Sequence, residues 1–492
     1  MSRRSTGPAH DPTHAMLRRT KIVTTLGPAT DDPVVLEAMI RAGADVARVN
    51  FSHGRAEEHA RRVQLVRDAA ARAGRYVGLL GDLAGPKIRI DRFAAGPVQL
   101  SEGAPFVLDV SLDPEAGTAA SVGVAYKDLP RDVKQGDVLL LNDGQLVLDV
   151  EKVDGPRIHT VVRIGGELSN QKGINRQGGG LSAGALTDKD REDIKTAAQL
   201  GLDYLAVSFA RDAADMREAR TLVKKAGGDA RVVAKIERSE AIQNLNSIID
   251  ASDVVMVARG DLGVEMGYAE ITGLQKTIIH QSRNRNRVVI TATQMMESMI
   301  TNPIPTRAEV SDVSNAVMDG TDAVMLSAES AVGKYPVKAV EAMSDIIRGA
   351  EKYQLSHSRV RHRVEGQFQG TDEAIAMAVM YTANHLKTRA IVALTESGST
   401  PLWMSRIRSD IPIYAFARHE VTRRRVTLYR GVYPVPFDIT HTDPQTLYRS
   451  IFHLMLELGL AAENELVILT KGELSGVSGG TNSMKILRVT RD

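Results

Sequence analysis

Three short segments end apolar stretches with residues that can do chemistry: Ala234–Arg238, Met256–Gly263 and Ile290–Glu297. Side chains alternate along a strand, so Lys235 and Glu237 point to the same side. Asp261 ends the second apolar stretch. A lysine and two carboxylates at the ends of successive strands suit a divalent metal and a phosphorylated acid. A plain ion pair at a strand end is the structural alternative for Lys235 and Glu237.

The elements that must position these residues alternate along the chain. Apolar runs of strand length occur at Ile22–Thr25, Val46–Val49, Tyr76–Leu80, Tyr204–Val207, Val232–Ile236, Val254–Val257, Val288–Thr291 and Ala323–Leu326. Amphipathic helical stretches separate most of them, at Val34–Ala42, Ala56–Ala73, Lys189–Leu200, Ala213–Ala226, Gln275–Arg283 and Val310–Val317. This alternation predicts an α/β fold with a parallel sheet, and eight apolar strands favour a closed (β/α)₈ TIM barrel over an open doubly wound sheet.

The alternation breaks once, between Lys87 and about Lys172, where short strands and turn signals replace the helical period. This segment is predicted to be a small β-barrel lid domain inserted after the third strand. Beyond residue 350, the alternation resumes after a polar linker, with a predicted helix at Thr371–Leu386 and predicted strands at Ala390–Leu394, Ile413–Phe416 and Glu465–Leu469. The predicted domains are a flexible tail at 1–17, the catalytic barrel at 18–86 and 173–348, the lid at 87–172, and a C-terminal α/β regulatory domain at 349–492.

Composition excludes several classes of protein. The chain has 492 residues with 62 basic and 60 acidic side chains, a balance that argues against a nucleic-acid binder. No cysteine is present, so disulfides and thiolate metal sites are excluded and any metal must take oxygen ligands. No apolar run is long enough to span a bilayer, and the first seventeen residues contain no apolar core of signal-peptide length. We expect a soluble cytoplasmic enzyme without membrane partners.

Active sites of (β/α)₈ barrels form at the carboxyl ends of the strands. In this chain those ends are polar: Arg48–Gly54, Gly81–Asp82, Ser208–Phe209, Lys235–Glu237, Arg259–Asp261, Thr291–Gln294 and Ser327–Glu329. Alternation predicts that Arg48 shares a face with Asn50, and Thr291 with Thr293. The polar pairs should therefore converge at one mouth.

Six motifs together resemble those of pyruvate kinase, from about Arg19 to the C-terminus. They are Leu26–Thr30, Arg48–Gly54, Gly85–Arg89, Met256–Gly263, Thr291–Met299 and Pro305–Glu309. The resemblance implies transfer of the phosphoryl group of phosphoenolpyruvate to ADP, giving ATP and pyruvate in the last step of glycolysis. It also implies a homotetramer, and agrees with the barrel, lid and C-terminal domain inferred above.

The resemblance assigns roles residue by residue. Glu237 and Asp261 would hold Mg²⁺ or Mn²⁺, and Lys235 would lie against the transferring phosphoryl group and the enolate oxygen. Arg48 would neutralise phosphoryl oxygens, and Thr293 would lie near the enolate. The turn at Gly260 and Asp261 would open a short helix whose N–H groups bind the substrate carboxylate. Nucleotide binding would use Asn50, His53, Arg89 and Lys172; a hydrogen-bonding role in the turn is the alternative for His53.

One departure concerns a monovalent cation. Many pyruvate kinases hold K⁺ at positions that match Asn50, Ser52, Asp82 and the carbonyl of Leu83, with a glutamate nearby. This chain has Lys87 in place of that glutamate. The hypothesis is that the Lys87 ammonium supplies the charge and repels a second cation, so K⁺ is not required. The alternative is a solvated Lys87 with K⁺ still bound through Leu83.

A second candidate site lies in the C-terminal domain, where a predicted strand runs into hydroxyls and a glycine that could hold an effector phosphate. These residues are Thr395, Ser397, Gly398, Ser399 and Thr400, with Lys471–Gly480 as a partner loop. A sugar phosphate or AMP is the predicted allosteric activator; an ordinary capped helix is the alternative. The glycines at 178–180 are interpreted as a lid hinge rather than a phosphate cradle.

Three functions remain open from the sequence. The first is an active pyruvate kinase. The second is another barrel enzyme that handles a pyruvate enolate on a metal, and the third is a catalytically silent sensor on the kinase scaffold. The joint presence of Lys235, Glu237, Asp261, Arg48 and Thr293 speaks against silence.

Overall fold

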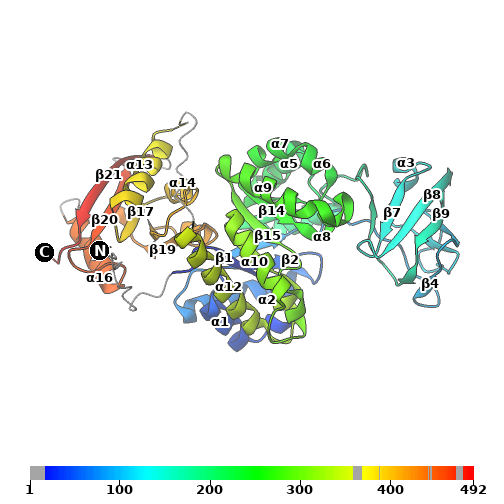
Figure 1. Ribbon diagram of the computed structural model, residues 1–492, viewed down its shortest axis with the longest axis horizontal. Helices are drawn as coiled ribbons and strands as arrows, with labels where there is room; N and C mark the ends of the chain where they lie inside the picture. Colours follow the sequence, from blue (N-terminus) through cyan, green and yellow to red (C-terminus); the bar gives the residue numbers. More distant parts are fainter. Residues whose placement is uncertain are drawn as a thin grey trace, which may run out of the picture.

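Three bodies stand in a row in the structure, with the barrel between the C-terminal domain and the inserted domain (Figure 1). The computed structural model describes residues 17–357, 368, 370–386, 388–441, 443, 446–472 and 480–491. Within these ranges no helix is both long and apolar enough to cross a membrane.

The central body is the predicted closed parallel barrel, with strand order β1-β16-β15-β14-β13-β12-β3-β2. Its strands are β1 Lys21–Thr25, β2 Val46–Asn50, β3 Gly78–Asp82, β12 Tyr204–Val207, β13 Arg231–Ile236, β14 Val254–Ala258, β15 Val288–Ala292 and β16 Ala323–Leu326. The third strand lies two residues beyond the predicted Tyr76–Leu80. Each strand is apolar on both faces because one face fills the barrel and the other packs against helices.

Helices cover the outside of the barrel. They are α1 Pro33–Ala42, α2 Ala56–Ala73, α4 Asp188–Gln199, α5 Ala213–Lys225, α6 Ser239–Gln243, α7 Leu245–Ala251, α8 Arg259–Met266, α9 Ile271–Asn284, α10 Arg307–Asp319, α11 Ala328–Ala331 and α12 Pro336–His357. Short 3₁₀ turns lie at Pro28–Thr30, Tyr268–Glu270 and Glu297–Ile300. Capping residues set several starts: Thr306 accepts from the backbone N–H of Glu309 while Glu309 bonds back to Thr306.

The inserted domain contains β4 Val98–Leu100, β5 Pro105–Asp109, β6 Ser121–Gly123, α3 Leu129–Asp132, β7 Val138–Leu141, β8 Leu146–Asp154, β9 Arg157–Ile164, β10 Gly166–Leu168 and β11 Ile174–Arg176. Its strands form a six-stranded sheet, β11-β7-β8-β9-β5-β6, and a two-stranded sheet, β10-β4. Isolated bridges Arg89–Gly173 and Ile90–Val124 join residues next to β11 and β6, the two edges of the six-stranded sheet, as closure into a small barrel requires. Strand β11 lies past the predicted lid boundary at residue 172.

The C-terminal domain has a five-stranded sheet in the order β19-β18-β17-β20-β21. Its elements are α13 Thr371–Leu386, β17 Ala390–Leu394, α14 Ser399–Ser405, β18 Ile413–Ala417, α15 Glu420–Val426, β19 Val432–Pro436, a 3₁₀ turn Ile439–His441, α16 Leu447–Glu457, β20 Leu466–Gly472 and β21 Thr481–Arg488. The sequence pattern predicts α13, β17, β18 and β20 but not β19 or β21.

The C-terminal domain closes the amino-terminal end of the barrel, opposite the carboxyl ends of the strands. The Tyr204 hydroxyl, at the start of β12, donates to the Arg425 carbonyl at 2.7 Å. Arg424 pairs with Asp203 at 3.1 Å, and Arg406 pairs with Asp322 just before β16. Barrel-interior side chains and C-terminal side chains belong to one buried apolar cluster. The floor of the barrel and the C-terminal domain therefore share a core.

Candidate active site

Lys235 occupies the centre of the charged groups at the barrel mouth. It lies on the interior face of β13, together with Val233, as strand alternation predicts. Its ammonium nitrogen lies 2.9 Å from Glu237 and 3.3 Å from Asp82, and it donates to the Ser208 hydroxyl at 2.7 Å. Burial acts to lower the pKa of Lys235, but the carboxylates of Asp82 and Glu237 outweigh it and raise that pKa. The lysine is held charged.

Asp82 is the shared counter-ion of two cations. Its carboxylate is buried at the end of β3, 2.6 Å from the Arg48 guanidinium and 3.3 Å from Lys235. Arg48 also donates to the Thr25 hydroxyl at 3.1 Å, which fixes the guanidinium at the mouth. Burial acts to raise the pKa of Asp82, whereas Lys235 and Arg48 hold it below its usual value. Arg48 and Lys235 thus present fixed positive charge side by side.

Glu237 and Asp261 are the candidate metal ligands. Glu237 is buried and accepts a hydrogen bond from the Phe209 backbone N–H at 2.8 Å. Burial raises the pKa of Glu237 above its usual value. The Lys235 charge acts to lower that pKa, and the Asp261 carboxylate acts to raise it. Two carboxylates that repel each other this way fit a small divalent cation, and Mg²⁺ commonly takes one or two protein carboxylates and fills its other positions with water and substrate oxygen. Within the described ranges, no set of three or more His, Asp or Glu could hold a metal ion.

Gly260 and Thr293 meet where α8 begins. The Gly260 backbone N–H donates to the Thr293 hydroxyl at 2.8 Å. Thr293 has φ of 68° and Gln294 has φ of 51°, conformations that non-glycine residues seldom adopt and that concentrate at functional sites. The expectation that Thr291 and Thr293 share a face is wrong, because the left-handed backbone turns Thr293 into the mouth. The Thr291 hydroxyl is buried and bonds to the Thr321 hydroxyl at 3.0 Å.

Lys87 lies at the mouth beside Asp261, one of the two candidate metal ligands. Its ammonium nitrogen lies 3.3 Å from Asp261 and 3.8 Å from Asp143 of the inserted domain. The predicted monovalent-cation residues form a different neighbourhood: the Asn50 side chain accepts from the Ser52 backbone N–H at 3.1 Å. The Leu83 carbonyl oxygen accepts a hydrogen bond from the Ser208 hydroxyl at 2.7 Å. A carbonyl oxygen has two lone pairs, and this bond uses one of them.

The four predicted nucleotide residues come from two sides of the mouth. Asn50 is the last residue of β2, and His53 follows the strand and is exposed. Arg89 and Lys172 lie at the base of the inserted domain, where the Arg89 guanidinium donates to the Gln171 carbonyl at 2.8 Å. A ligand that contacts all four would bridge the barrel and the inserted domain.

The inserted domain rests on α8, the helix that carries Asp261. The Tyr268 hydroxyl donates to the Asp143 carbonyl at 3.0 Å, and the Gly178 N–H donates to the Glu265 carbonyl at 3.1 Å. Val264 packs against apolar residues of β7 and β8. Gly178, Gly179 and Gly180 all have positive φ where the chain returns to the barrel, a conformation that favours glycine, and their role as a lid hinge stays a prediction.

The predicted effector residues form the turn between β17 and α14. The Gly398 N–H donates to the Thr395 hydroxyl at 2.9 Å, and the hydroxyls of Ser397 and Ser399 lie 3.3 Å apart. The Thr400 hydroxyl is buried against the Thr481 hydroxyl at 2.7 Å, so it already has a partner. Residues 473–479 of the predicted partner loop lie outside the described residues.

Ser208 is the site residue that sequence reasoning did not assign. It follows β12 and links the Lys235 ammonium to the Leu83 carbonyl through its hydroxyl. The signal was present, because Ser208 is the polar residue at the carboxyl end of a barrel strand, as Asp82 is.

Comparison with known proteins shows which family has this arrangement. Residues 17–340 match the family model described as pyruvate kinase, barrel domain, and residues 373–487 match the model described as pyruvate kinase, alpha/beta domain. The two matches together cover most of the chain.

Curated relatives agree with these matches. The chain is 54% identical over 477 residues to "Pyruvate kinase II" of Salmonella typhimurium, covering 96% of this chain and 99% of the relative. It is 52% identical over 460 residues to a pyruvate kinase of Haemophilus influenzae, covering 93% and 96%. A pyruvate kinase of Geobacillus stearothermophilus is 42% identical over 477 residues, covering 96% of this chain and 80% of the relative.

Proposed function

The chain belongs to the pyruvate kinase family, and we propose that its chemistry runs through Lys235, Arg48, Glu237, Asp261 and Thr293 at the barrel mouth. The enzyme transfers the phosphoryl group of phosphoenolpyruvate to ADP, giving ATP and pyruvate. The reaction is part of glycolysis, from which we infer a cytoplasmic location. The observation that carries the residue assignment is the buried cluster in which Asp82 and Glu237 hold two cations toward one opening.

Lys235 and Arg48 stabilise the charge that moves during transfer. Phosphoryl transfer spreads negative charge over the phosphoryl and enolate oxygens, and fixed cations stabilise that charge best where water is excluded. Both side chains are only 12% exposed and are held by Asp82, so they need little reorganisation as the charge develops. Mg²⁺ or Mn²⁺ held by Glu237 and Asp261 would supply further positive charge at the phosphoryl oxygens.

The first turn of α8 positions the other end of the substrate. Its N–H groups begin at the mouth, where a helix N-terminus favours a carboxylate. Thr293 lies against Gly260 and would face the enolate carbon. A threonine hydroxyl is too weak an acid to be the sole proton donor, so we assign protonation of the enolate to water that Thr293 orients.

Steady-state kinetics with Lys235→Met tests these assignments. We expect ADP-dependent pyruvate formation, measured by a coupled assay, to fall by on the order of a hundredfold or more because the central charge is lost. Lys195→Met is the matched control, since Lys195 is exposed on α4 and pairs with the exposed Glu192 at 2.7 Å. Wild-type rates in the Lys235→Met variant would refute the assignment. Tight phosphoenolpyruvate binding without turnover by the wild type would identify a silent sensor instead.

Lys87 supports a proposal about monovalent cations. It stands in place of the glutamate of K⁺-dependent members and brings a fixed ammonium group to the mouth. We therefore expect full activity in tetramethylammonium buffer without Na⁺ or K⁺. The Lys87→Glu variant should be activated by K⁺, because the site then loses a positive charge and gains a negative one. A large rise in the wild-type rate on adding K⁺ would refute the proposal that Lys87 replaces the monovalent cation.

A phosphorylated activator and a homotetramer complete the proposal. The hydroxyl-rich turn at 395–400 supports an effector phosphate, with AMP or a sugar phosphate as the candidates. Measurement of phosphoenolpyruvate half-saturation with each candidate, for the wild type and for Ser397→Ala, tests the site. If no candidate changes the phosphoenolpyruvate half-saturation, the proposed effector site is refuted. Sedimentation of the full chain tests the tetramer.

A further inference from the structure

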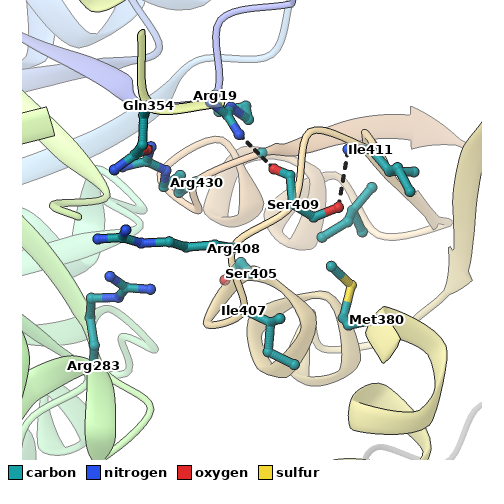
Figure 2. A pocket seen from close by; sticks show the side chains of 12 residues that line it. Arg19, Arg283, Gln354, Met380, Ser405, Ile407, Arg408, Ser409, Ile411 and Arg430 are labelled. Atoms are coloured by element: carbon teal, nitrogen blue, oxygen red, sulfur yellow. Dashed lines mark hydrogen bonds between the residues drawn. The ribbon is translucent and has the colours of Figure 1, made fainter. Parts of the chain in front are cut away.

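Two small cavities lie at opposite ends of the barrel. Figure 2 shows the one between the barrel floor and the C-terminal domain, where the Arg19 guanidinium donates to the Ser409 carbonyl at 2.7 Å. Its volume is about 20 Å³, and that of the cavity beside Lys87 and Asp261 at the mouth is the same, so each has room for about one water molecule. Packing this close carries a shift of one group to its neighbours. A side chain that supports a mouth loop from outside can therefore affect the site without touching a ligand.

The first turn of α4 supports two mouth loops in this way. The Lys189 ammonium donates to the Phe51 carbonyl at 2.7 Å, and the Asp190 carboxylate accepts from the Gly85 backbone N–H at 3.1 Å. Phe51 belongs to the loop after β2, and Gly85 belongs to the turn after β3. One helical turn thus fixes both loops to the outer layer of the barrel.

Asp190 does more than begin the helix. It is fully buried, and one of its oxygens accepts from the backbone N–H and the hydroxyl of Thr187, at 2.8 Å and 2.7 Å. These bonds complete the capping box of α4. The other oxygen reaches across to Gly85. A buried carboxylate is costly unless both of its oxygens are hydrogen-bonded, so burial as well as geometry favours the Gly85 bond.

The Gly85 turn is supported from the opposite side as well. Gly85 has φ of 65°, and a Cβ atom there would lie 2.8 Å from the Ser208 side chain and 2.9 Å from the Phe209 ring. Ser208 and Phe209 therefore form a wall against which only glycine fits. The bond to Asp190 holds the turn at that wall, so loss of the bond frees the turn to move away from it.

The two loops carry residues proposed to bind ADP. Asn50 and His53 flank Phe51, and Arg89 follows Gly85 in the same segment. Three of the four proposed nucleotide residues thus stand on loops that α4 holds.

We propose that Lys189 and Asp190 are positioning residues for ADP, acting through the Phe51 carbonyl and the Gly85 N–H. The proposal rests on the nucleotide role proposed for the two loops. Phosphoenolpyruvate depends less on these loops, because its proposed cationic side chains lie within barrel strands that are paired on both sides. Binding of the nucleotide should therefore suffer first when α4 releases the loops.

Steady-state kinetics with each substrate varied in turn test the proposal in the full chain. For Asp190→Ala we expect the KM for ADP to rise about tenfold, the loss typical of a hydrogen bond to a charged group. The KM for phosphoenolpyruvate and kcat should change by less than about twofold, because uniform binding of the nucleotide is what is lost. Lys189→Met should raise the KM for ADP about threefold, since the Lys189 side chain is half exposed and its hydrogen bond competes with water.

Two variants are matched controls. Thr187→Ala removes the cap hydroxyl of α4 but keeps the bond between Asp190 and Gly85, so the effect of a weakened helix would appear there as well. Lys195→Met removes an exposed lysine of the same helix. Both should keep the wild-type KM for ADP. Circular dichroism shows whether each variant is folded, and Lys189→Met carries the test if Asp190→Ala is not.

An unchanged KM for ADP in folded Lys189→Met and Asp190→Ala would overturn the proposal, as would an equal rise in Thr187→Ala. Arg89→Gln shows which assignment fails. A raised KM for ADP in that variant alone removes the positioning role. An unchanged KM for ADP in Arg89→Gln and in His53→Gln removes the nucleotide role of the loops, and the positioning role with it.

Discussion

The Glu265→Gln substitution should make the enzyme more stable, by a margin that grows as pH rises from about 4.5 to 7 and is full above 7. Glu265 lies on α8 under the inserted domain and is 4% exposed. Its carboxylate accepts the Ser239 backbone N–H at 2.9 Å. Glutamine keeps the shape of the side chain and an oxygen for that bond, but carries no charge at any pH.

The magnitude follows from the pKa. Burial raises the pKa of Glu265 from 4.5 to about 7, and the Ser239 bond and the charge of Arg238 offset only part of this. Between these values the folded protein binds a proton that the unfolded chain has released. Stability of the wild type therefore falls as pH rises from about 4.5 to 7, and the loss is complete above 7. At about 1.4 kcal/mol per pH unit, the full loss is about 3 kcal/mol.

Thermal midpoints measured from pH 5.5 to 8.5 test this reasoning. The variant should exceed the wild type by the full difference at pH 8.5, and the two should approach each other at pH 5.5. Glu270→Gln is the matched control, because Glu270 is exposed in the turn that follows α8 and should show no such trend. A difference between Glu265→Gln and wild type that does not depend on pH, or a wild type that is the more stable at pH 8.5, would refute the assignment of a neutral buried carboxyl.

Three further outcomes are expected. Asp82→Asn removes the shared counter-ion of two cations, so kcat/KM in the coupled assay should fall by on the order of a hundredfold while the circular dichroism spectrum stays unchanged. Thr293→Val leaves the Gly260 N–H without its acceptor, a cost of about 1–3 kcal/mol, and should lower kcat/KM by about tenfold or more, whereas Thr293→Ser should retain most activity. Arg406→Gln leaves a buried Asp322 unpaired and should destabilise the junction of barrel and C-terminal domain by about 3–5 kcal/mol in urea unfolding, against little change for the exposed Arg348→Gln.

The sequence predicts the regular parts of this site well. Lys235 of β13 and Glu237, one residue beyond its end, lie on the same side and 2.9 Å apart, and Arg48 lies at the carboxyl end of β2, because strand alternation holds wherever the strand is regular. Alternation fails at Thr293, where the left-handed backbone begins one residue after β15 ends. No local sequence pattern predicts that left-handed turn. The partner of Lys87 was missed for a different reason, since it depends on how the inserted domain sits over α8.

The two unpredicted strands share a physical cause. β19 and β21 are the edges of the C-terminal sheet, so each pairs on one side only. β19 contains Pro434 and Pro436, which an edge strand tolerates because a missing N–H leaves no ladder bond unmade. β21 is half exposed and mixes polar with apolar residues. Neither has the continuous apolar run of the central strands.

Strand β12 connects the C-terminal domain to the active site, in addition to forming part of the barrel wall. Its first residue, Tyr204, is bonded to the C-terminal domain through Arg425, and the residue just after its last, Ser208, is bonded to Lys235. The two ends lie about 13 Å apart at 3.3 Å per residue. Because β12 is hydrogen-bonded to β3 and β13, it resists stretching, so a shift of the C-terminal domain that moved Tyr204 along the strand would also move Ser208. The lysine ammonium would then move with a domain that never approaches the substrate.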